Sequence, residues 1–320
     1  MRELSVGDRL DQYRLVEVLA RSGMASIFKA IDILAGHSLV LKIPYLQFES
    51  DPIFYSRFQR EEKIGQRLDH PNLIKILAPR RKRRVYIAME YFGDNSLRAQ
   101  MRDGVVLPMQ LALSYVRQLC EALIYIHREG GVPRDLKPEN ILINANGEIK
   151  IMDFGIALDK WSRRLTFAGK SSTLGTPDYM SPEQVGGQRG DARSDIYALG
   201  TILLEMVTGT VPFAGLNVSG AMRAKAESDP RPPSAFRPEI DPHIEEIILH
   251  AIERRPPNRY PNAEAMLEDL PNPSSVRLEG RAKSLKPISP EMEHFKHALV
   301  VAGGFVVLIA VFAGLVFLGG

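Results

Sequence analysis

Three side chains that could take part in proton and phosphate chemistry lie within six consecutive positions of the segment PRDLKPEN. Asp135 could accept a proton from a hydroxyl group, and Lys137 could neutralise charge on a group that is being transferred. The amide oxygen of Asn140 is the kind of ligand that a hard cation such as Mg²⁺ prefers. The segment therefore predicts a site that combines a base, a cation and a metal ligand.

A second oxygen ligand follows further along the chain. In the segment IKIMDFG, Asp153 comes at the end of a short apolar run typical of a strand, and a glycine turn follows it. Together with Asn140 it predicts a magnesium site at two adjacent hairpin ends, where a polyphosphate supplies the remaining ligands. In-line phosphoryl transfer needs this set, which is a base for the nucleophile and cations on the phosphates.

A lysine and a glutamate upstream form a further candidate pair. The alternation in SLVLKI places Lys42 on the same face of a strand as Val40. In the helical stretch that we expect over 53–68, Glu61 falls in the middle of the apolar stripe. A carboxylate in that place is costly unless a cation meets it, so we expect a buried ion pair between Lys42 and Glu61. Taken alone, either residue is read more simply as a surface charge.

The elements that must position these residues change in kind along the chain. Between residues 13 and 92, short apolar runs are typical of strands, and one helical stretch interrupts them. From 93 to 270 helices predominate, as in LALSYVRQLCEALIYIH, where apolar positions recur at helical spacing and Gly130 marks the helix end. A β-rich lobe followed by an α-rich lobe predicts a ligand cleft between them.

The last part of the chain differs in composition. Residues 271–297 are rich in proline, serine and charge, which predicts a flexible linker. Residues 298–318 are 21 positions without a charged side chain, and a helix of that length reaches about 30 Å, the thickness of a bilayer core. Cations precede this span and none follows it. We therefore expect a single-pass protein of the cell (inner) membrane, in contact with lipid, with the bulk of the chain in the cytoplasm. Ala310 and Gly314 form a pair of small residues four positions apart, a pattern found where two membrane helices pack together, so a homodimer is possible.

Bulk composition excludes several classes of protein. The 320 residues are 45% hydrophobic and 25% charged, which is the composition of an ordinary globular protein and not of a disordered one. The net charge of +3 is too small to indicate a nucleic-acid partner, and the basic run at 80–84 is read most simply as a solvated hairpin tip. The single cysteine, Cys120, fits a core residue in a reducing compartment.

Taken in order, the motifs resemble those of the bacterial eukaryotic-like (Hanks-type) serine/threonine protein kinases. LARSGMASIFKA resembles the loop that covers the nucleotide, LVLK the strand with the phosphate-binding lysine, and AMEYF the hinge that binds adenine. PRDLKPEN resembles the catalytic loop, DFG the metal loop, GTPDYMSPE the end of the activation segment and SDIYALG the helix that anchors the catalytic loop. Each motif is weak alone, but all of them occur in the family's order over residues 13–270.

The resemblance implies an α+β, bilobal protein-kinase fold with a β-rich N-lobe (13–92) and an α-rich C-lobe (93–270). Composition adds the juxtamembrane linker (271–297) and one C-terminal transmembrane helix (298–318). It implies ATP and Mg²⁺ as cofactors, with Mn²⁺ as an alternative metal, and proteins bearing serine or threonine as substrates. The catalytic residues that it implies are Lys42, Glu61, Asp135 and Lys137, and the metal ligands are Asn140 and Asp153. The implied nucleotide-binding residues are Leu19, Ala20, Arg21, Ser22, Gly23, Met24, Ala25, Ser26, Ile27, Val40, Lys42, Glu90, Phe92 and Leu142. The implied structural residues are Phe154, Gly155, Glu183, Asp195 and Arg259, with Glu183 paired to Arg259.

Regulation is also implied by the resemblance. Arg134 resembles the arginine onto which a phosphorylated activation segment docks, and Ser171, Ser172 and Thr173 lie at suitable positions. We expect autophosphorylation there, at Thr173 in particular. Thr176, together with Lys137, resembles the pattern of serine/threonine specificity.

Three departures from the family pattern bear on activity. The nucleotide-covering loop has Ala20, Ser22 and Ala25 in place of its glycines, which predicts weaker ATP affinity. Val40 replaces an alanine and predicts a tighter roof over adenine, and Pro133 replaces a histidine and removes an N–H donor. These departures leave an alternative open, a pseudokinase that acts as a nucleotide-responsive binding module. A kinase fold that acts on small molecules is a further alternative, which the complete activation segment disfavours.

Overall fold

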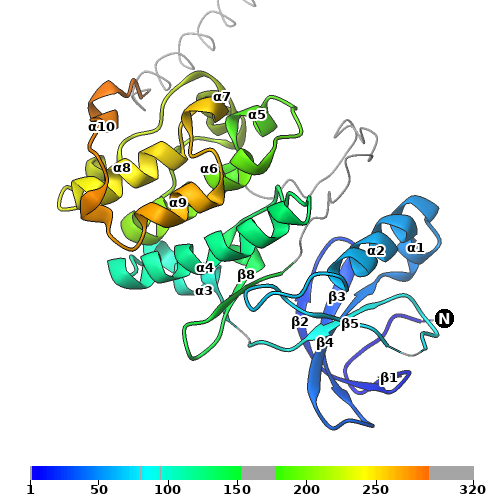
Figure 1. Cartoon of the computed structure of the whole chain (residues 1–320). Helices are drawn as coiled ribbons and strands as arrows, with labels where there is room; N and C mark the ends of the chain where they lie inside the picture. The colour runs from blue at the N-terminus through cyan, green and yellow to red at the C-terminus, as the bar shows by residue number, and fades with distance from the viewer. Residues whose placement is uncertain (1, 80, 94, 153–176, 288–320) are drawn as a thin grey trace, which may run out of the picture.

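The computed structural model of the chain describes residues 2–79, 81–93, 95–152 and 177–287, with only the backbone at Arg57. Within these residues a lobe built on a β-sheet adjoins a helical lobe, and the chain crosses between them once, after β6 (Ile87–Glu90) (Figure 1). The bilobal α+β fold expected from the sequence is confirmed.

The N-lobe is a six-stranded antiparallel sheet in the order β1-β2-β3-β4-β6-β5. Besides β6, its strands are β1 (Arg9–Leu10), β2 (Tyr13–Arg21), β3 (Ala25–Asp32), β4 (Ser38–Pro44) and β5 (Ile76–Leu77). Successive side chains of β4 point to opposite faces of the sheet. Leu39, Leu41 and Ile43 belong to the apolar cluster on one face, and Val40 belongs to the cluster on the other. Lys42 therefore shares the face of Val40, as the sequence pattern predicts.

One long helix of the N-lobe, α2 (Pro52–Gly65), follows the short α1 (Leu46–Glu49) and packs beside the sheet (Figure 1). It starts where the Asp51 side chain accepts hydrogen bonds from the first backbone N–H groups and Pro52 supplies a pre-set φ. It approaches β5 closely, since a Cβ atom built on Gly65 would lie 2.4 Å from Ile76 Cγ1. A glycine is thus required for this helix to sit where it does.

The C-lobe core surrounds two helices, α4 (Met109–Arg128) and α6 (Ala192–Thr208). Every residue of α6 from Ser194 to Val207 is buried, and Gly200 allows contact with Ala251 of α8. The surrounding helices are α3 (Leu97–Gln100), α5 (Pro182–Val185), α7 (Val218–Glu227), α8 (Pro242–Ala251) and α9 (Ala263–Asp269). Cys120 is buried in this core, as expected, and burial raises the pKa of its thiol.

The end of α4 shows why the sequence reading of this helix was reliable. Gly130 has φ +79°, its N–H donates to the His127 carbonyl, and the N–H of Gly131 donates to the Ile126 carbonyl. This is a Schellman motif, which needs a residue without a Cβ at its left-handed position. The motif turns the chain directly into the segment that contains Asp135.

A small sheet beneath the N-lobe carries the catalytic-loop candidate. It consists of β7 (Asn95–Ser96), β8 (Ile141–Ile143) and β9 (Ile149–Ile151), all paired antiparallel. Short 3₁₀ turns complete the described chain. They are η1 (Arg102–Gly104), η2 (Pro138–Asn140), η3 (Pro177–Tyr179), η4 (Pro233–Ala235), η5 (Pro256–Asn258) and η6 (Pro273–Ser275).

Residues 271–287 differ from the flexible linker that we expected. They form η6 and α10 (Arg281–Ser284), which lies beside α8 at the end of the C-lobe far from the N-lobe (Figure 1). Arg281 pairs with Glu246 at 2.5 Å, and Leu285 packs against the C-lobe core. Composition could not predict this docking. It depends on one arginine, Arg281, that pairs with the buried carboxylate of Glu246, and the content of proline and serine does not reveal such a pair.

The predicted membrane span at 298–318 lies outside the described residues. Among those that the structure describes, no helix is both long and apolar enough to cross a bilayer.

Candidate active site

The catalytic-loop candidate brings its three polar side chains together as the sequence predicts. Lys137 Nζ lies 2.7 Å from Asp135 Oδ2, and Asn140 Nδ2 donates to the Asp135 backbone oxygen at 3.0 Å. The Asp135 side chain is 53% exposed, so a hydroxyl group of another molecule can reach it. Asn140 is buried, and its N–H donates to the Lys137 carbonyl within η2. The loop therefore offers an accessible carboxylate with an ammonium held beside it.

Of the two expected metal ligands, Asn140 and Asp153, the structure describes Asn140. Asn140 uses its amide nitrogen toward Asp135, which turns its oxygen away as a potential ligand. The Met152 N–H donates to the Asn140 carbonyl at 2.8 Å, so the chain position before Asp153 is adjacent to Asn140. Asp153, Phe154 and Gly155 lie outside the described residues. Within the described ranges no three His, Cys, Asp or Glu residues converge as a metal site.

The pair expected between the N-lobe strand and helix is formed. Lys42 Nζ of β4 donates to Glu61 Oε1 of α2 at 2.8 Å. The two side chains are 17% and 28% exposed, so the pair is only partly buried, contrary to the expectation of a buried pair. This partial exposure lowers the desolvation cost of keeping both groups charged.

Apolar side chains from the two lobes meet in one cluster next to Lys42. The expected nucleotide-binding residues Leu19, Ile27 and Val40 pack there from the N-lobe, and Phe92 and Leu142 join them from the hinge and from β8. The cluster also contains Met89, Tyr91 and Met152, which the sequence analysis did not name. Met89 could have been found, because it precedes Glu90 on β6 and pairs with Val40 across the sheet. The cluster has the composition of a surface that holds a flat apolar ring.

The Glu90 side chain bonds to other residues of the protein, Lys75 and Lys150, and is not directed at a ligand. Its carboxylate accepts from the Lys75 backbone N–H at 2.8 Å and pairs with Lys150 of β9. Lys150 Nζ also lies 5.1 Å from the centre of the Phe92 ring. Because Glu90 belongs to the N-lobe and Lys150 to the C-lobe, this contact links the lobes beside the hinge.

The turn between β2 and β3 explains why glycine is dispensable there. Ser22 Oγ accepts hydrogen bonds from the N–H groups of Met24 and Ala25, and the Ser22 N–H donates to the Ala25 carbonyl. The described non-glycine residues with positive φ lie elsewhere, and Gly23 is not among the glycines with positive φ. The turn is therefore built without left-handed backbone, and its hydroxyl replaces the freedom that glycines would supply. Its remaining expected nucleotide contacts, Ala20, Arg21 and Ser26, flank the turn on paired strands.

The anchor of the catalytic loop is a buried carboxylate with two partners. Asp195 of α6 is fully buried; its Oδ1 accepts from the Arg134 N–H at 2.8 Å, and its Oδ2 lies 2.9 Å from His127 Nε2. Burial raises the pKa of Asp195, and the contacts with His127 oppose that shift. Arg134 has φ +63°, a strained conformation for arginine, and Gln184 also holds its carbonyl, at 2.9 Å.

Pro133, next to this anchor, is buried and has no N–H to donate. His127, at the end of α4, is the partner that the sequence analysis missed. Its position three residues before Gly130 was visible, but nothing local pointed to α6.

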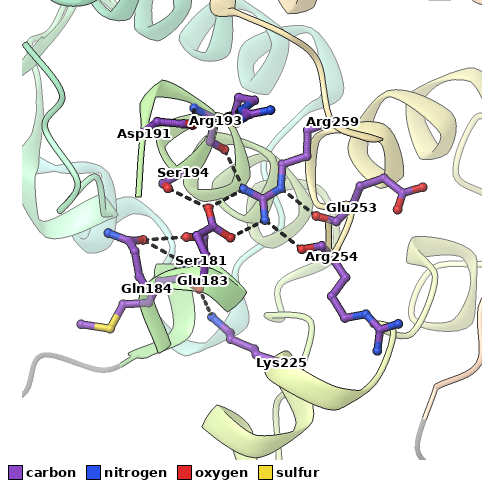
Figure 2. A network of polar contacts seen from close by, with 11 residues as sticks. Ser181, Glu183, Gln184, Asp191, Arg193, Ser194, Lys225, Glu253, Arg254 and Arg259 are labelled. Atoms are coloured by element: carbon purple, nitrogen blue, oxygen red, sulfur yellow. Dashed lines mark hydrogen bonds and ion pairs between the residues drawn. The ribbon is translucent and has the colours of Figure 1, made fainter. Parts of the chain in front are cut away.

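The expected pair between Glu183 and Arg259 is formed, and little of it is exposed: 0% of the Arg259 side chain and 9% of the Glu183 side chain (Figure 2). Two guanidinium nitrogens of Arg259 bond the two Glu183 oxygens at 2.8 and 2.7 Å. The remaining N–H groups donate to the carbonyls of Glu253, Arg193 and Arg254, so all five donors have partners. Burial alone would raise the pKa of Glu183, but the bonds from Arg259 and Ser194 outweigh it and lower that pKa.

A second polar network, around Arg98, was not predicted. Arg98 of α3 bonds Glu205 of α6 at 2.7 Å and Glu139 of η2 at 2.8 Å, and it also contacts the Tyr179 hydroxyl. Tyr179 in turn donates to Glu205. The network joins the catalytic loop to the turn after the activation segment. The regulatory candidates Ser171, Ser172, Thr173 and Thr176 lie outside the described residues.

Comparison with known proteins agrees with this geometry. The protein kinase domain family matches residues 13–270. The serine/threonine-protein kinase PknB of Mycolicibacterium smegmatis is 35% identical over 295 residues, which cover 88% of this chain and 45% of that protein. PknB of Mycobacterium tuberculosis is 34% identical over 270 residues, covering 81% and 42%. The chain thus spans less than half the length of these relatives.

A solved structure shows the same fold. The kinase domain of PknI from Mycobacterium tuberculosis superposes with a TM-score of 0.64 at 25% identity, and the match covers 85% of this chain and all of that one. The family match extends over the whole segment that carries the two lobes, the Lys42–Glu61 pair and the Asp135 loop. The chain belongs to the protein kinase family.

Proposed function

We propose that the chain is an active serine/threonine protein kinase that transfers the γ-phosphate of ATP to hydroxyl groups of proteins. The observation that carries the proposal is that one chain holds both an intact pair of Lys42 and Glu61 and a catalytic loop in which Asp135, Lys137 and Asn140 are in contact. None of the departures in the sequence displaces these groups. The relatives that the chain matches are named as serine/threonine kinases, which supports the same substrate class.

The residues divide the work of transfer between the lobes. Asp135 orients the substrate hydroxyl and accepts its proton, and Lys137 lies close enough to share the charge of the transferred phosphate. Lys42, held in place by Glu61, neutralises the phosphates from the N-lobe. The apolar cluster around Val40 and Leu142 holds the adenine ring. The oxygen of Asn140, with Asp153, would hold Mg²⁺, which supplies charge neutralisation on the phosphates when it is bound.

The test is transfer of label from γ-labelled ATP to a generic protein substrate by wild type and by Asp135→Asn. Loss of the base lowers kcat by about 10²- to 10⁴-fold, while the variant remains folded. Equal transfer by both proteins, or no transfer by wild type, would contradict the proposal. The second result would favour the pseudokinase alternative.

We also propose that phosphorylation in the activation segment, at Thr173, raises activity. Arg134 is the expected docking group, and burial together with the nearby charge of Arg189 lowers the pKa of Arg134. Two cations in one place favour an incoming phosphate dianion. Mass spectrometry of wild type and of Asp135→Asn, made side by side, tests this. Phosphate at 171–173 in the wild type alone supports autophosphorylation, and unphosphorylated but fully active protein would overturn it.

Membrane attachment through residues 298–318 is a further part of the proposal. The uncharged span and the cations before it support a single-pass anchor with the kinase domain in the cytoplasm. The experiment is flotation of the chain with liposomes, followed by protease treatment of sealed vesicles from expressing cells. A protein that stays in the soluble fraction contradicts the anchor. Cross-linking in the same liposomes reports whether it forms a homodimer.

A further inference from the structure

Lys225 of α7 is a buried lysine that neither the motifs nor the proposed mechanism uses. The residue is 1% exposed, and its ammonium group donates hydrogen bonds to three backbone oxygens. These belong to Pro177 at 2.6 Å, Met180 at 2.9 Å, and Asp178. Three N–H donors thus meet three carbonyl acceptors, which uses the full capacity of the group.

The three carbonyls lie in one short turn, residues 177–180. This turn connects the activation segment to the SPE motif, where Ser181 begins α5. Within the turn the Met180 N–H donates to the Pro177 carbonyl at 3.2 Å. Carbonyl oxygens that converge on one point cannot satisfy one another, so a further donor stabilises them. Lys225 supplies it from α7, and Figure 2 shows its side chain reaching toward the start of α5 from the side opposite Arg259.

The same turn is held from other directions by groups already described. Arg259 fixes Glu183 immediately after it, and the Tyr179 hydroxyl joins Arg98 and Glu205. Within the described residues, the side-chain hydrogen bonds to the backbone of the turn come from Lys225. A change at Lys225 therefore alters the path of the chain beside Asp135 without touching a group that reacts.

We propose that Lys225 is a positioning residue for the protein substrate, which fixes the backbone of residues 177–180 as part of the surface that binds the substrate peptide. This inference rests on the proposed function, because it requires a peptide acceptor. It separates substrate binding from the grip on the nucleotide phosphates, since Lys42 and its partner Glu61 lie in the other lobe.

The protonation state of Lys225 predicts that the KM for the substrate peptide depends on pH. Burial lowers the pKa of Lys225 to about 7, and the Asp178 carboxylate opposes that shift. A neutral amine has two N–H donors and a lone pair, so deprotonation leaves one of the three carbonyls facing a lone pair.

Other titratable groups lie on the elements packed against α7. Among the described residues they include Asp178 and Tyr179 of η3 and Glu183 of α5, which is paired with Arg259. Tyr197 of α6 has its ring centre 5.5 Å from Lys225 Nζ, and α6 also carries Arg193, Asp195 and Glu205, the last bonded to Arg98. Burial raises the pKa of Asp178, and burial likewise raises the pKa values of Tyr179 and Tyr197. Glu183 has a lowered pKa. We therefore attribute a change near neutral pH to Lys225.

The experiment measures steady-state kinetics of the full chain of 320 residues in detergent, with a serine peptide that lacks His and Cys. Wild type, Lys225→Met, Lys225→Arg and the control Lys283→Met are compared from about pH 6 to about pH 9, with separate KM values for peptide and ATP. Lys283 lies exposed in α10, so the control makes the same substitution on the surface.

The expected result is a rise of about tenfold in the peptide KM of Lys225→Met at low pH, with the KM for ATP unchanged. In wild type the peptide KM rises as pH increases through about 7, and in Lys225→Arg this rise disappears, because arginine stays charged. A peptide KM in Lys225→Met equal to that of Lys283→Met overturns the inference. A wild-type peptide KM that is constant over the pH range also overturns the inference. This measurement needs no variant, so it remains decisive even if both Lys225 variants fail to fold. Absence of any transfer by wild type would instead overturn the proposed function.

Discussion

The backbone of the catalytic loop is held in a strained conformation by bonds from a few single residues. Arg134 adopts a left-handed backbone without glycine, and its two backbone polar groups are bonded by Asp195 and Gln184. Such strain persists only where the surroundings fix it. Pro133 gives no N–H to this arrangement, so His127 becomes the second partner of the buried Asp195 carboxylate. The loop of this chain thus depends on a histidine outside the catalytic motif.

This dependence predicts the effect of His127→Phe. The substitution keeps a ring of similar size but leaves Asp195 with one partner fewer in a buried place, so we expect a loss of about 1–3 kcal/mol in the free energy of unfolding. We also expect a lower kcat, because the Asp135 loop loses part of its anchor. Urea unfolding and transfer assays measure the two effects, with His37→Phe, an exposed site, as the control. An unfolding free energy equal to that of the control would mean that His127 is not needed.

The sequence revealed the reacting groups better than the groups that hold them. Asp135, Lys137 and Asn140 are adjacent in sequence, and Lys42 and Glu61 follow from strand and helix periodicity, so local pattern predicted their contacts. Other contacts were invisible because the partners lie far apart in the chain and on surfaces without periodic signal. These are the contacts His127–Asp195, Arg98–Glu205 and Lys225 with residues 177–180.

Among elements, the position of α2 decides whether Lys42 has its partner. The helix packs against β5 at Gly65, where an added Cβ would overlap Ile76 Cγ1. The long strands of this lobe agree with the alternation in the sequence, because each has one face on a core. Helix α2 ends at Gly65, three residues before the expected end at 68. The close approach at Gly65 could not be predicted, since it depends on the depth at which the helix packs and not on its pattern.

Gly65→Ala should therefore displace α2. We expect a loss of about 1–3 kcal/mol in stability and a higher KM for ATP, because Glu61 moves with the helix. Combining it with Ile76→Ala, which removes the overlapping atoms, should recover the ATP affinity more than the stability. If the double variant and Gly65→Ala have the same KM for ATP, the helix position is not what Gly65 controls.

The enclosed pair of Glu183 and Arg259 joins α5 to the chain after η5. Arg259→Met leaves a buried carboxylate unpaired, so we expect a loss of about 3–5 kcal/mol in the free energy of unfolding. Glu183→Gln keeps part of the hydrogen bonding and should cost less. Thermal and urea unfolding of the two variants at neutral pH make the comparison. A smaller loss in Arg259→Met than in Glu183→Gln would contradict this ranking.

The same pair gives a pH dependence with a definite sign. Because the pKa of Glu183 is lowered in the folded state, its contribution to stability is fully present above the ordinary glutamate pKa of 4.5. That contribution is lost as pH falls through the folded pKa. The difference in stability between wild type and Glu183→Gln should accordingly be constant at neutral pH and shrink in acid.

On the scale of the whole molecule, the C-lobe continues beyond the segment that the family pattern covers. Residues 271–287 dock on α8 through Arg281, which bonds Glu246 and also lies near Glu253 and Glu279. The Lys286 N–H donates to Asp229 Oδ2 at 3.0 Å. The two lobes were predictable from the change from strand to helix patterns near residue 93. This extension was not, because its composition resembles that of a linker.

Arg281→Ala should release this extension. We expect faster amide hydrogen exchange across 277–287 and a loss of about 1–3 kcal/mol in stability, since Glu246 remains buried without its partner. Hydrogen exchange with mass spectrometry compares it with Lys283→Ala, an exposed site on the same helix. Unchanged exchange in Arg281→Ala relative to that control would show that the extension is held by its apolar contacts alone.

Binding of Mg²⁺-ATP tests most directly the central claim, that the two lobes form one nucleotide site between Lys42 and the Asp135 loop. Titration calorimetry of the full chain with a non-hydrolysable ATP analogue should give saturable binding that weakens when Mg²⁺ is removed. Binding should also weaken by about tenfold or more in Lys42→Met, since a charged hydrogen bond is lost. Absence of heat from wild type at millimolar nucleotide, or equal binding by Lys42→Met, would contradict it.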